Sequence, residues 1–205
     1  AITIALKHWT IDNKRVNQLE RIHIQSEVEQ LKAQVNPQLL FNILNRTAVL
    51  ARGEPDEASG MLLKLSQILR YQLYDCSRKA VLLKAEINFL TNYLALEQLY
   101  SKRIRYSVSA EGEVDRTFVP PLLFIPFVQQ AVVHVYGQDT FTAIDLQFRV
   151  ENSRIHFVCS FDNGNLPDQN DFSSIRQRLE LLYGDNYSLS ISKRIIMLKL
   201  NMLKL

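Results

Sequence analysis

The chain has 205 residues, which is enough for one large domain or two small ones. A hydrophobic fraction of 47% supports a real core and excludes a disordered chain, while charged residues make up 22% and leave a net charge of +3. Because the lysines and arginines are scattered, this weak excess of positive charge indicates solvated surface and no nucleic-acid footprint.

The two cysteines, Cys76 and Cys159, lie far apart in the sequence and match no metal-ligand spacing. In a chain of this size they suit a reducing compartment, where free cysteines behave as small hydrophobic residues. No cluster of His, Cys, Asp and Glu has the spacing of a zinc site, so we expect no metal bound in that way.

The first residues suggest a membrane-proximal start. No run of about 18 apolar residues occurs, so no segment of this sequence is expected to span a membrane. Residues 1–6 are a short apolar stretch followed by Lys7, His8 and Trp9, and the chain begins with Ala. This pattern suits a fragment that starts at the cytoplasmic end of a transmembrane helix; a frayed helix start is the alternative.

Two helices are expected in the first third of the chain. The first runs from about Lys7 to Leu50, and its apolar residues recur four and three apart as in a coiled-coil seam. That seam consists of Ile24, Val28, Leu31 and Val35, with Val16 and Leu19 in a shifted register. Residues 52–60, with two glycines and a proline, form the break before a second amphipathic helix that starts at Met61 and reaches Leu73. Two such helices predict an antiparallel hairpin, and two hairpins predict a dimeric four-helix bundle.

The remainder mixes helices and strands. A third helix is expected over Leu83–Lys102, and a period of two follows at Ile104, Tyr106 and Val108. Val119-Pro120-Pro121 stops the chain and opens an apolar run to Val135, which predicts a buried helix. The later elements are two strands (Thr142–Val150 and Arg154–Phe161) joined by a turn at 151–153, a helix (Phe172–Tyr183) capped by Gly184, and two short strands (Tyr187–Ser192 and Ile195–Leu200). We therefore expect an α+β fold with helices on one face of a mostly antiparallel sheet.

One heptapeptide, Asn36-Pro37-Gln38-Leu39-Leu40-Phe41-Asn42, stands out because a proline interrupts a helical pattern. Such a proline removes one backbone donor and bends a helix, so the residue after it is displayed at a kink. The segment resembles the phosphoacceptor motif of the LytS-type sensor histidine kinases, Asn-Pro-His-Phe-Leu-Phe-Asn. Gln38 stands at the position of the phosphorylated histidine, and a glutamine amide is not a nucleophile.

The resemblance covers about residues 31–184 in ordered blocks. Leu65–Tyr71 resembles the family's second dimerisation helix, and Asn92–Glu97 resembles its linking helix. Val119–Leu123 leads into a segment that resembles its nucleotide-binding helix. Ile175–Leu179 and Leu181–Gly184 resemble the helix that follows its lid. The resemblance implies a dimerisation hairpin within residues 1–80. It also implies an ATP-binding α/β sandwich, of the type shared with Hsp90-like ATPases, over 81–205.

The nucleotide helix of such kinases reads Glu-Asn-Ala-Ile-Lys-His, and here the stretch is Gln129-Gln130-Ala131-Val132-Val133-His134. The resemblance puts Gln129 at the position of the base and Gln130 at the magnesium ligand, with His134 as a further nucleotide-site position. Gln129 cannot take a proton. Gln130 keeps an amide oxygen on a longer arm, whereas Mg²⁺ demands near-ideal octahedral geometry.

The remaining nucleotide positions implied by the resemblance are Asp162 and Gly164, which match the Asp-x-Gly that binds the adenine amino group, and Arg178 in the last block. By itself Asp162-Asn163-Gly164 is more often simply a turn, and its place among the other blocks is what favours the adenine position. The family's lid is glycine-rich, but residues 165–174 contain no glycine and carry Asp168 and Asp171, which would repel a triphosphate.

These departures favour a degenerate sensor histidine kinase of a bacterial two-component system. It would be a dimer on the cytoplasmic face of the inner membrane that has lost autophosphorylation, with weak or lost binding of Mg-ATP. Its partners would be an active histidine kinase or a response regulator. One alternative is an active ATP-dependent kinase with altered ligands or an engineered Gln38, and another is a coiled-coil adaptor.

Overall fold

The structure is a computed structural model of the chain, and it describes residues 37–136, 141–163 and 172–202. From Phe41 onward the described residues belong to one compact unit. The predicted seam between Val16 and Val35 and the membrane-proximal start lie outside the described residues. So do Gly164 and the lid residues up to Asp171.

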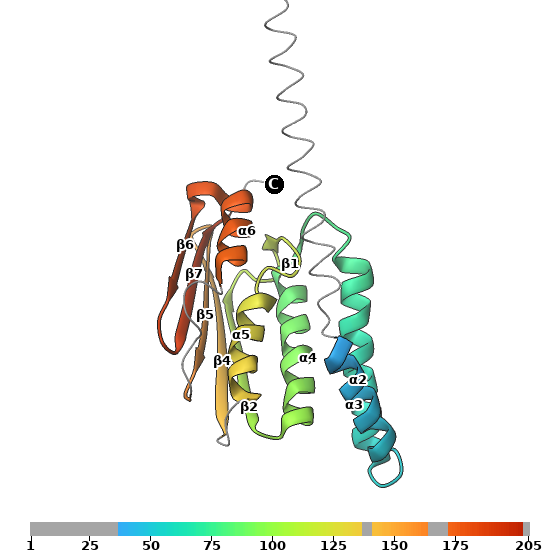
Figure 1. Cartoon of the computed structure of the whole chain (residues 1–205). Coiled ribbons are helices and arrows are strands. Elements are labelled where there is room, and N and C mark those ends of the chain that lie inside the picture. The colour runs from blue at the N-terminus through green and yellow to red at the C-terminus, as the bar shows by residue number, and fades with distance from the viewer. Residues whose placement is uncertain (1–36, 137–140, 164–171, 203–205) are drawn as a thin grey trace, which may run out of the picture. The chain divides into compact units, whose positions relative to one another are not determined.

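Two helices come first along the described chain, and a short strand, single helices and pairs of strands follow them (Figure 1). The helices are α2 (Pro37–Leu50), α3 (Pro55–Arg70), α4 (Leu83–Ser101), α5 (Ile125–Tyr136) and α6 (Ser173–Tyr183), with a π-helical turn η1 (Tyr71–Asp75) after α3 and a 3-10 turn η3 (Gly184–Asn186) after α6. The strands are β1 (Val81–Leu82), β2 (Ile104–Gly112), β3 (Phe118–Val119), β4 (Thr142–Glu151), β5 (Arg154–Phe161), β6 (Tyr187–Ile191) and β7 (Ile195–Asn201).

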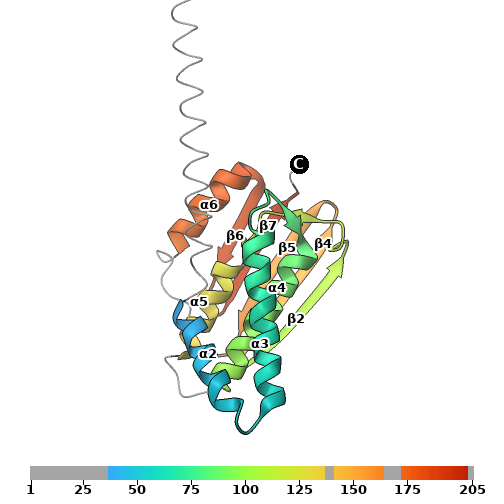
Figure 2. The ribbon, with the colours of Figure 1, turned by 90° about the vertical axis from the view of Figure 1, so that its right-hand side faces the viewer.

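The main sheet has the strand order β2-β4-β5-β7-β6, in which only β2 and β4 pair in parallel. Helices α4, α5 and α6 lie on one face of this sheet (Figures 1 and 2). Strands β1 and β3 form a separate two-stranded pair. The expected α+β fold with a mostly antiparallel sheet is therefore confirmed, which removes the support for a coiled-coil adaptor. The dimeric hairpin stays a prediction.

The core lies between the sheet and the helices. Every second residue of β4 from Thr142 to Val150 is buried, and β5 and β7 alternate in the same way. Aromatic rings fill the centre: the ring of Phe124 meets that of Phe148 edge-on at 5.2 Å and that of Phe157 at 4.8 Å, measured between centroids. These contacts fix the segment before α5 against the sheet.

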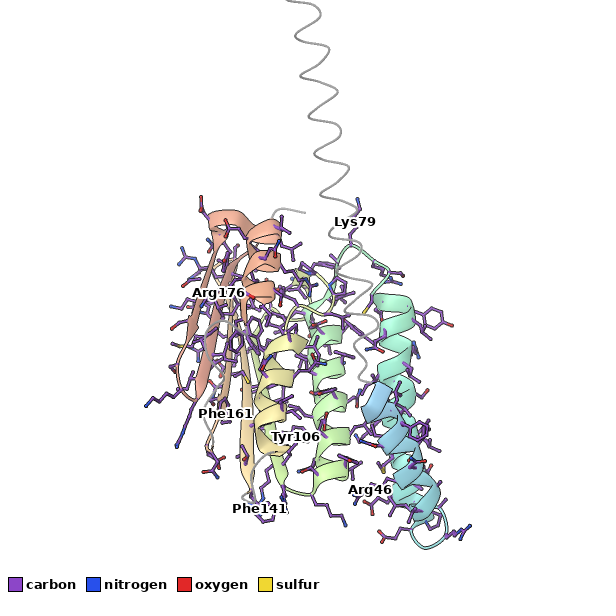
Figure 3. The ribbon with its side chains drawn as sticks, in the orientation of Figure 1. Arg46, Lys79, Tyr106, Phe141, Phe161 and Arg176 are labelled. Carbon is purple, nitrogen blue, oxygen red and sulfur yellow. The ribbon has the colours of Figure 1, made fainter. Side chains whose placement is uncertain are left out.

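Helix α4 also carries contacts on the side away from the sheet. Arg46 points from α2 toward α4 (Figure 3), and its Nη1 donates a hydrogen bond of 2.8 Å to the carbonyl oxygen of Tyr100. Ile43 on α2 and Met61 and Leu65 on α3 are buried. Among the described helices, none is both long enough and apolar enough to cross a bilayer.

Several predicted boundaries agree with the structure. Helix α4 ends at Ser101, and α6 is followed by Gly184 with a φ of 52°. The turn between β4 and β5 is tight, because Asn152 and Ser153 both take positive φ angles. Strands β6 and β7 match their predicted ranges to within one residue at each end.

Other boundaries were wrong. Residues 55–60 are the start of α3 and not part of a break, because Pro55 suits the first helical turn and Asp56 and Glu57 favour its positive end. Helix α5 begins at Ile125, four residues beyond Pro121, since Leu122 has a φ of 56° that no α-helix accepts. Strands β1 and β3 were missed because two residues show no periodicity.

Candidate functional site

Helix α5 presents two amides beside an apolar face. Phe127, Val128 and Ala131 are fully buried in the layer between the helices and the sheet. Gln129 and Gln130 are half-buried, and Val133 is 63% exposed. Glutamine side chains do not ionise between pH 5 and 9, so this helix supplies hydrogen-bonding groups but no base at these two positions.

The end of β5 is joined to the beginning of β4 by side chains. The Oδ1 atom of Asp162 accepts a hydrogen bond of 2.7 Å from the backbone N–H of Ala143. The next residue, Asn163, donates from Nδ2 to the carbonyl oxygen of Phe141 at 2.7 Å. Within the described ranges, Oδ2 of the exposed Asp162 has no hydrogen bond. One oxygen of this carboxylate therefore has a structural partner, and the other can accept from a ligand.

The turn that precedes α5 is held from two sides. Oε2 of Glu86 accepts from the backbone N–H of Leu122 at 3.0 Å, and Oε1 accepts from that of Phe124 at 3.3 Å. From α6, Arg178 donates to the carbonyl oxygens of Leu122 at 2.7 Å and Pro121 at 2.8 Å. The backbone of this turn is thus satisfied by one carboxylate and one guanidinium from two different helices.

Glu86 is fully buried, with 0% of its surface exposed, and it accepts a further hydrogen bond from the hydroxyl of Tyr71. Burial raises the pKa of Glu86, whereas the hydrogen bonds from Tyr71, Phe124 and Leu122 and the charge of Arg178 oppose that rise. Burial also raises the pKa of Tyr71, so its hydroxyl stays protonated and donates. A buried carboxyl of this kind is tolerated only because all these donors meet it.

Comparison with known proteins indicates the family to which this chain is related. Residues 26–106 match the sequence profile described as histidine kinase. The sensor protein LytS of Bacillus cereus is 29% identical over 141 residues, which are 68% of this chain and 24% of LytS. The sensor histidine kinase YesM of Bacillus subtilis is 25% identical over 90% of this chain and 35% of YesM.

These matches support a member of the LytS-type sensor histidine kinase family. The chain spans about a quarter to a third of the length of these curated relatives. Among solved structures, the histidine kinase AdeS of Acinetobacter baumannii resembles it with a TM-score of 0.46 and 10% identity over 90% of this chain and 96% of AdeS. At that score the likeness adds no weight to the assignment.

The nucleotide positions implied by the LytS-type pattern fall on three elements. Gln129, Gln130 and His134 lie on α5, Asp162 follows β5, and Arg178 lies on α6. Arg178 is bound to the turn before α5, where it supports the main chain. Gly164 lies outside the described residues, and nothing is described of the side chain of His134. The roles assigned to these residues stay predictions.

The phosphoacceptor position of the LytS-type pattern lies on α2. Gln38 is the second residue of the described helix, directly after Pro37, and its side chain is not described. The kink expected at Pro37 involves residues before it, which also lie outside the described part. Groups of three or more His, Cys, Asp or Glu that could hold a metal ion do not occur among the described residues.

Glu86, Tyr71 and Leu122 were not singled out from the sequence. One signal was available, because Glu86 stands between Leu83, Ile87 and Leu90 on the apolar face of a predicted helix. A carboxylate at such a position needs buried donors, but the sequence does not say which. The two cysteines behave as expected, since both are buried and neither forms a disulfide.

Proposed function

We propose that this chain is the cytoplasmic signalling part of a sensor histidine kinase homologue that has lost autophosphorylation. In a bacterial two-component system it would act as a dimeric scaffold whose output is a change of shape. The observation that carries this proposal is Gln38, an amide at the position where family members carry the phosphorylated histidine. Without a nucleophilic nitrogen there, a γ-phosphoryl group has no acceptor on this helix.

The residues on the nucleotide-binding helix support the same proposal. Gln129 offers no proton acceptor, and Gln130 brings its amide oxygen on a side chain one methylene longer than asparagine. Val133 puts an exposed apolar side chain where a cation would attract phosphate. Each change weakens a different step of phosphoryl transfer, which depends on positioning and charge stabilisation. Binding of ATP and Mg²⁺ would therefore be weak or absent.

Dimerisation through α2 and α3 is the second part of the proposal. Large apolar side chains are exposed on these helices and on the turn that follows them: Phe41, Leu44, Val49, Leu62, Leu63, Leu73 and Tyr74. A monomer that leaves so many apolar side chains on one pair of helices in water gains free energy by covering them. A second copy of the chain would cover them best, and an active kinase or a response regulator would be the downstream partner.

The alternative is a working kinase with altered ligands. Asp162 favours it, because its Oδ2 atom has no hydrogen bond among the described residues and can accept from an adenine amino group. Such an enzyme would transfer phosphate to a histidine on another protein, or Gln38 would be an engineered change. Nucleotide binding separates this alternative from the scaffold.

Incubation of the purified chain with radiolabelled Mg-ATP tests the loss of autophosphorylation. We expect no acid-labile label on the unaltered chain and none on Q38H, because the nucleotide-site positions Gln129 and Gln130 are altered as well. The variant Q38H/Q129E/Q130N restores all three positions, and label on it would show that the scaffold remains competent. Acid-labile label on the unaltered chain would overturn the proposal.

A thermal-shift titration then tests nucleotide binding. A dissociation constant near 1 μM would add about 4 kcal/mol to stability at 1 mM Mg-ATP, a shift of several degrees. We expect no shift for the unaltered chain. The control D162N removes the carboxylate that would bind adenine. A shift that D162N abolishes would favour the working kinase.

A further inference from the structure

The buried carboxyl of Glu86 connects two parts of the chain that are far apart in sequence. Its donors are Leu122 and Phe124 in the turn before α5, and Tyr71 at the end of α3. Figure 1 shows α4 between α5 on the sheet side and α3 on the other side, so a residue of α4 can reach both. Glu86 therefore contacts both the turn before the candidate nucleotide helix and the end of the hairpin.

The turn before α5 would not keep its shape without the side chains of Glu86 and Arg178. Leu122 has a φ of 56°, a left-handed conformation that costs a leucine about 1 kcal/mol or more. Leu122 is only 1% exposed, so water cannot serve as the hydrogen-bond partner of its backbone groups. The turn keeps this conformation because Glu86 binds its N–H groups while Arg178 binds its carbonyl oxygens. The direction in which α5 leaves the turn depends on these contacts.

Tyr71 is placed to register changes in α3. It is the first residue of the π-helical turn η1, and its ring stacks on that of Phe89 with 4.6 Å between centroids. A change of twist in α3 that moved this ring would withdraw the hydroxyl from Glu86. The carboxyl would then lose one of its three hydrogen-bond donors.

We propose that Glu86 is the positioning residue for the start of α5, and that its bond to Tyr71 makes this position depend on the end of α3. Loss of the Tyr71 hydroxyl leaves the buried carboxylate of Glu86 less compensated and favours its neutral form, which accepts more weakly from Leu122 and Phe124. The strained turn then opens more often. This link does not depend on whether the chain binds nucleotide or phosphorylates anything.

Amide hydrogen exchange on the whole chain tests the link. Tyr71→Phe removes one hydroxyl, and Tyr74→Phe is the matched control, because Tyr74 lies on the same turn η1 but is 68% exposed. In Y71F we expect the amides of Leu122 and Phe124 to exchange about tenfold faster or more, while the amide of Phe157 in the central strand β5 keeps its rate. In Y74F all three amides keep their rates.

Equal rates for Leu122 and Phe124 in Y71F and Y74F would overturn the proposal. So would a uniform acceleration that includes Phe157, because a merely structural tyrosine would destabilise the unit as a whole. Glu86→Gln is the second variant. Its amide can accept through only one oxygen, so either Leu122 or Phe124 loses its acceptor and that single amide exchanges faster. Protection of both amides in E86Q would contradict the role of Glu86.

Discussion

A Cβ atom placed on Gly112 would lie 2.0 Å from the carbonyl oxygen of Val150, the residue that it faces in the neighbouring strand. Gly112 also has a φ of 84°, which L-residues rarely adopt. Gly112→Ala must therefore shift the backbone at the end of β2. We expect it to lower the free energy of unfolding by roughly 2 kcal/mol or more, measured by urea denaturation.

Gly60→Ala is the matched control and should act in the opposite direction. Gly60 lies inside α3, and a Cβ atom there would meet nothing within 4 Å. Alanine in a helix interior is favoured over glycine by about 1 kcal/mol, so G60A should raise the free energy of unfolding by about that amount. A loss of stability in G60A similar to that in G112A would show that the two sites do not differ as described.

Single residues also show where sequence reasoning ends. Asp162 was found from its place in a family pattern, and the structure adds that one of its oxygens binds Ala143. Glu86 and its donors were not found, because the partners Leu122 and Phe124 are 36 and 38 residues away along the chain. Hydrogen bonds across such separations leave no periodicity in the sequence.

At the scale of elements, periodicity and turn residues were sufficient for α4, α6 and the strands β4 to β7. The start of α5 could not be predicted, because it depends on a left-handed leucine that α4 and α6 hold together. The predicted start of α3 at Met61 is too late, because Pro55 begins the helix and Gly60 lies within it. Local sequence signals did not predict a helix start correctly where contacts between elements determine the backbone conformation.

The exposed apolar side chains of α2 and α3 make dimerisation testable at this scale. Leu63 is 63% exposed on α3. If a second copy covers it, Leu63→Glu places a charge in an apolar interface and should raise the dimer dissociation constant at least about tenfold. Sedimentation equilibrium over a range of concentrations measures this change.

Leu181→Glu is the control for that experiment. Leu181 is 40% exposed on α6, away from the proposed interface, and its replacement should leave the dissociation constant unchanged. Similar dissociation by both variants, or an unaltered chain that is monomeric at every concentration, would contradict an interface formed by α2 and α3.

In the molecule as a whole, stability is concentrated in the layer between the sheet and its helices. The other face of the sheet carries polar side chains together with Val158, Ile195 and Met197. Its Arg149–Glu111 ion pair is 62% and 65% exposed, so the pair contributes little. Within the covered layer lie Cys159 of β5 and Tyr183 of α6, both buried. Burial raises the pKa of the Cys159 thiol to about 12 and that of Tyr183 to about 12.

These two groups predict alkaline unfolding. The ordinary pKa values are 9.0 for the cysteine and 10.0 for the tyrosine, so above them the unfolded chain loses protons that the folded chain keeps. Stability is therefore complete below pH 9 and falls as the pH rises toward 12, by about 1.4 kcal/mol per pH unit for each group. By pH 11 the loss should reach about 3 kcal/mol from Cys159 and about 1 kcal/mol from Tyr183.

Urea titrations at pH 8, 9, 10 and 11 measure this slope, and Cys159→Ala isolates the thiol. C159A will be less stable than the unaltered chain at pH 8, because it leaves a small cavity beside the aromatic core. Its stability should nevertheless fall less steeply between pH 9 and 10, by about 1.4 kcal/mol per unit, since the group that titrates there is gone. Tyr183→Phe should keep the slope between pH 9 and 10 and reduce it only above pH 10. Identical slopes in all three proteins would mean that the thiol and the phenol titrate alike in the folded and unfolded chains, which contradicts their burial.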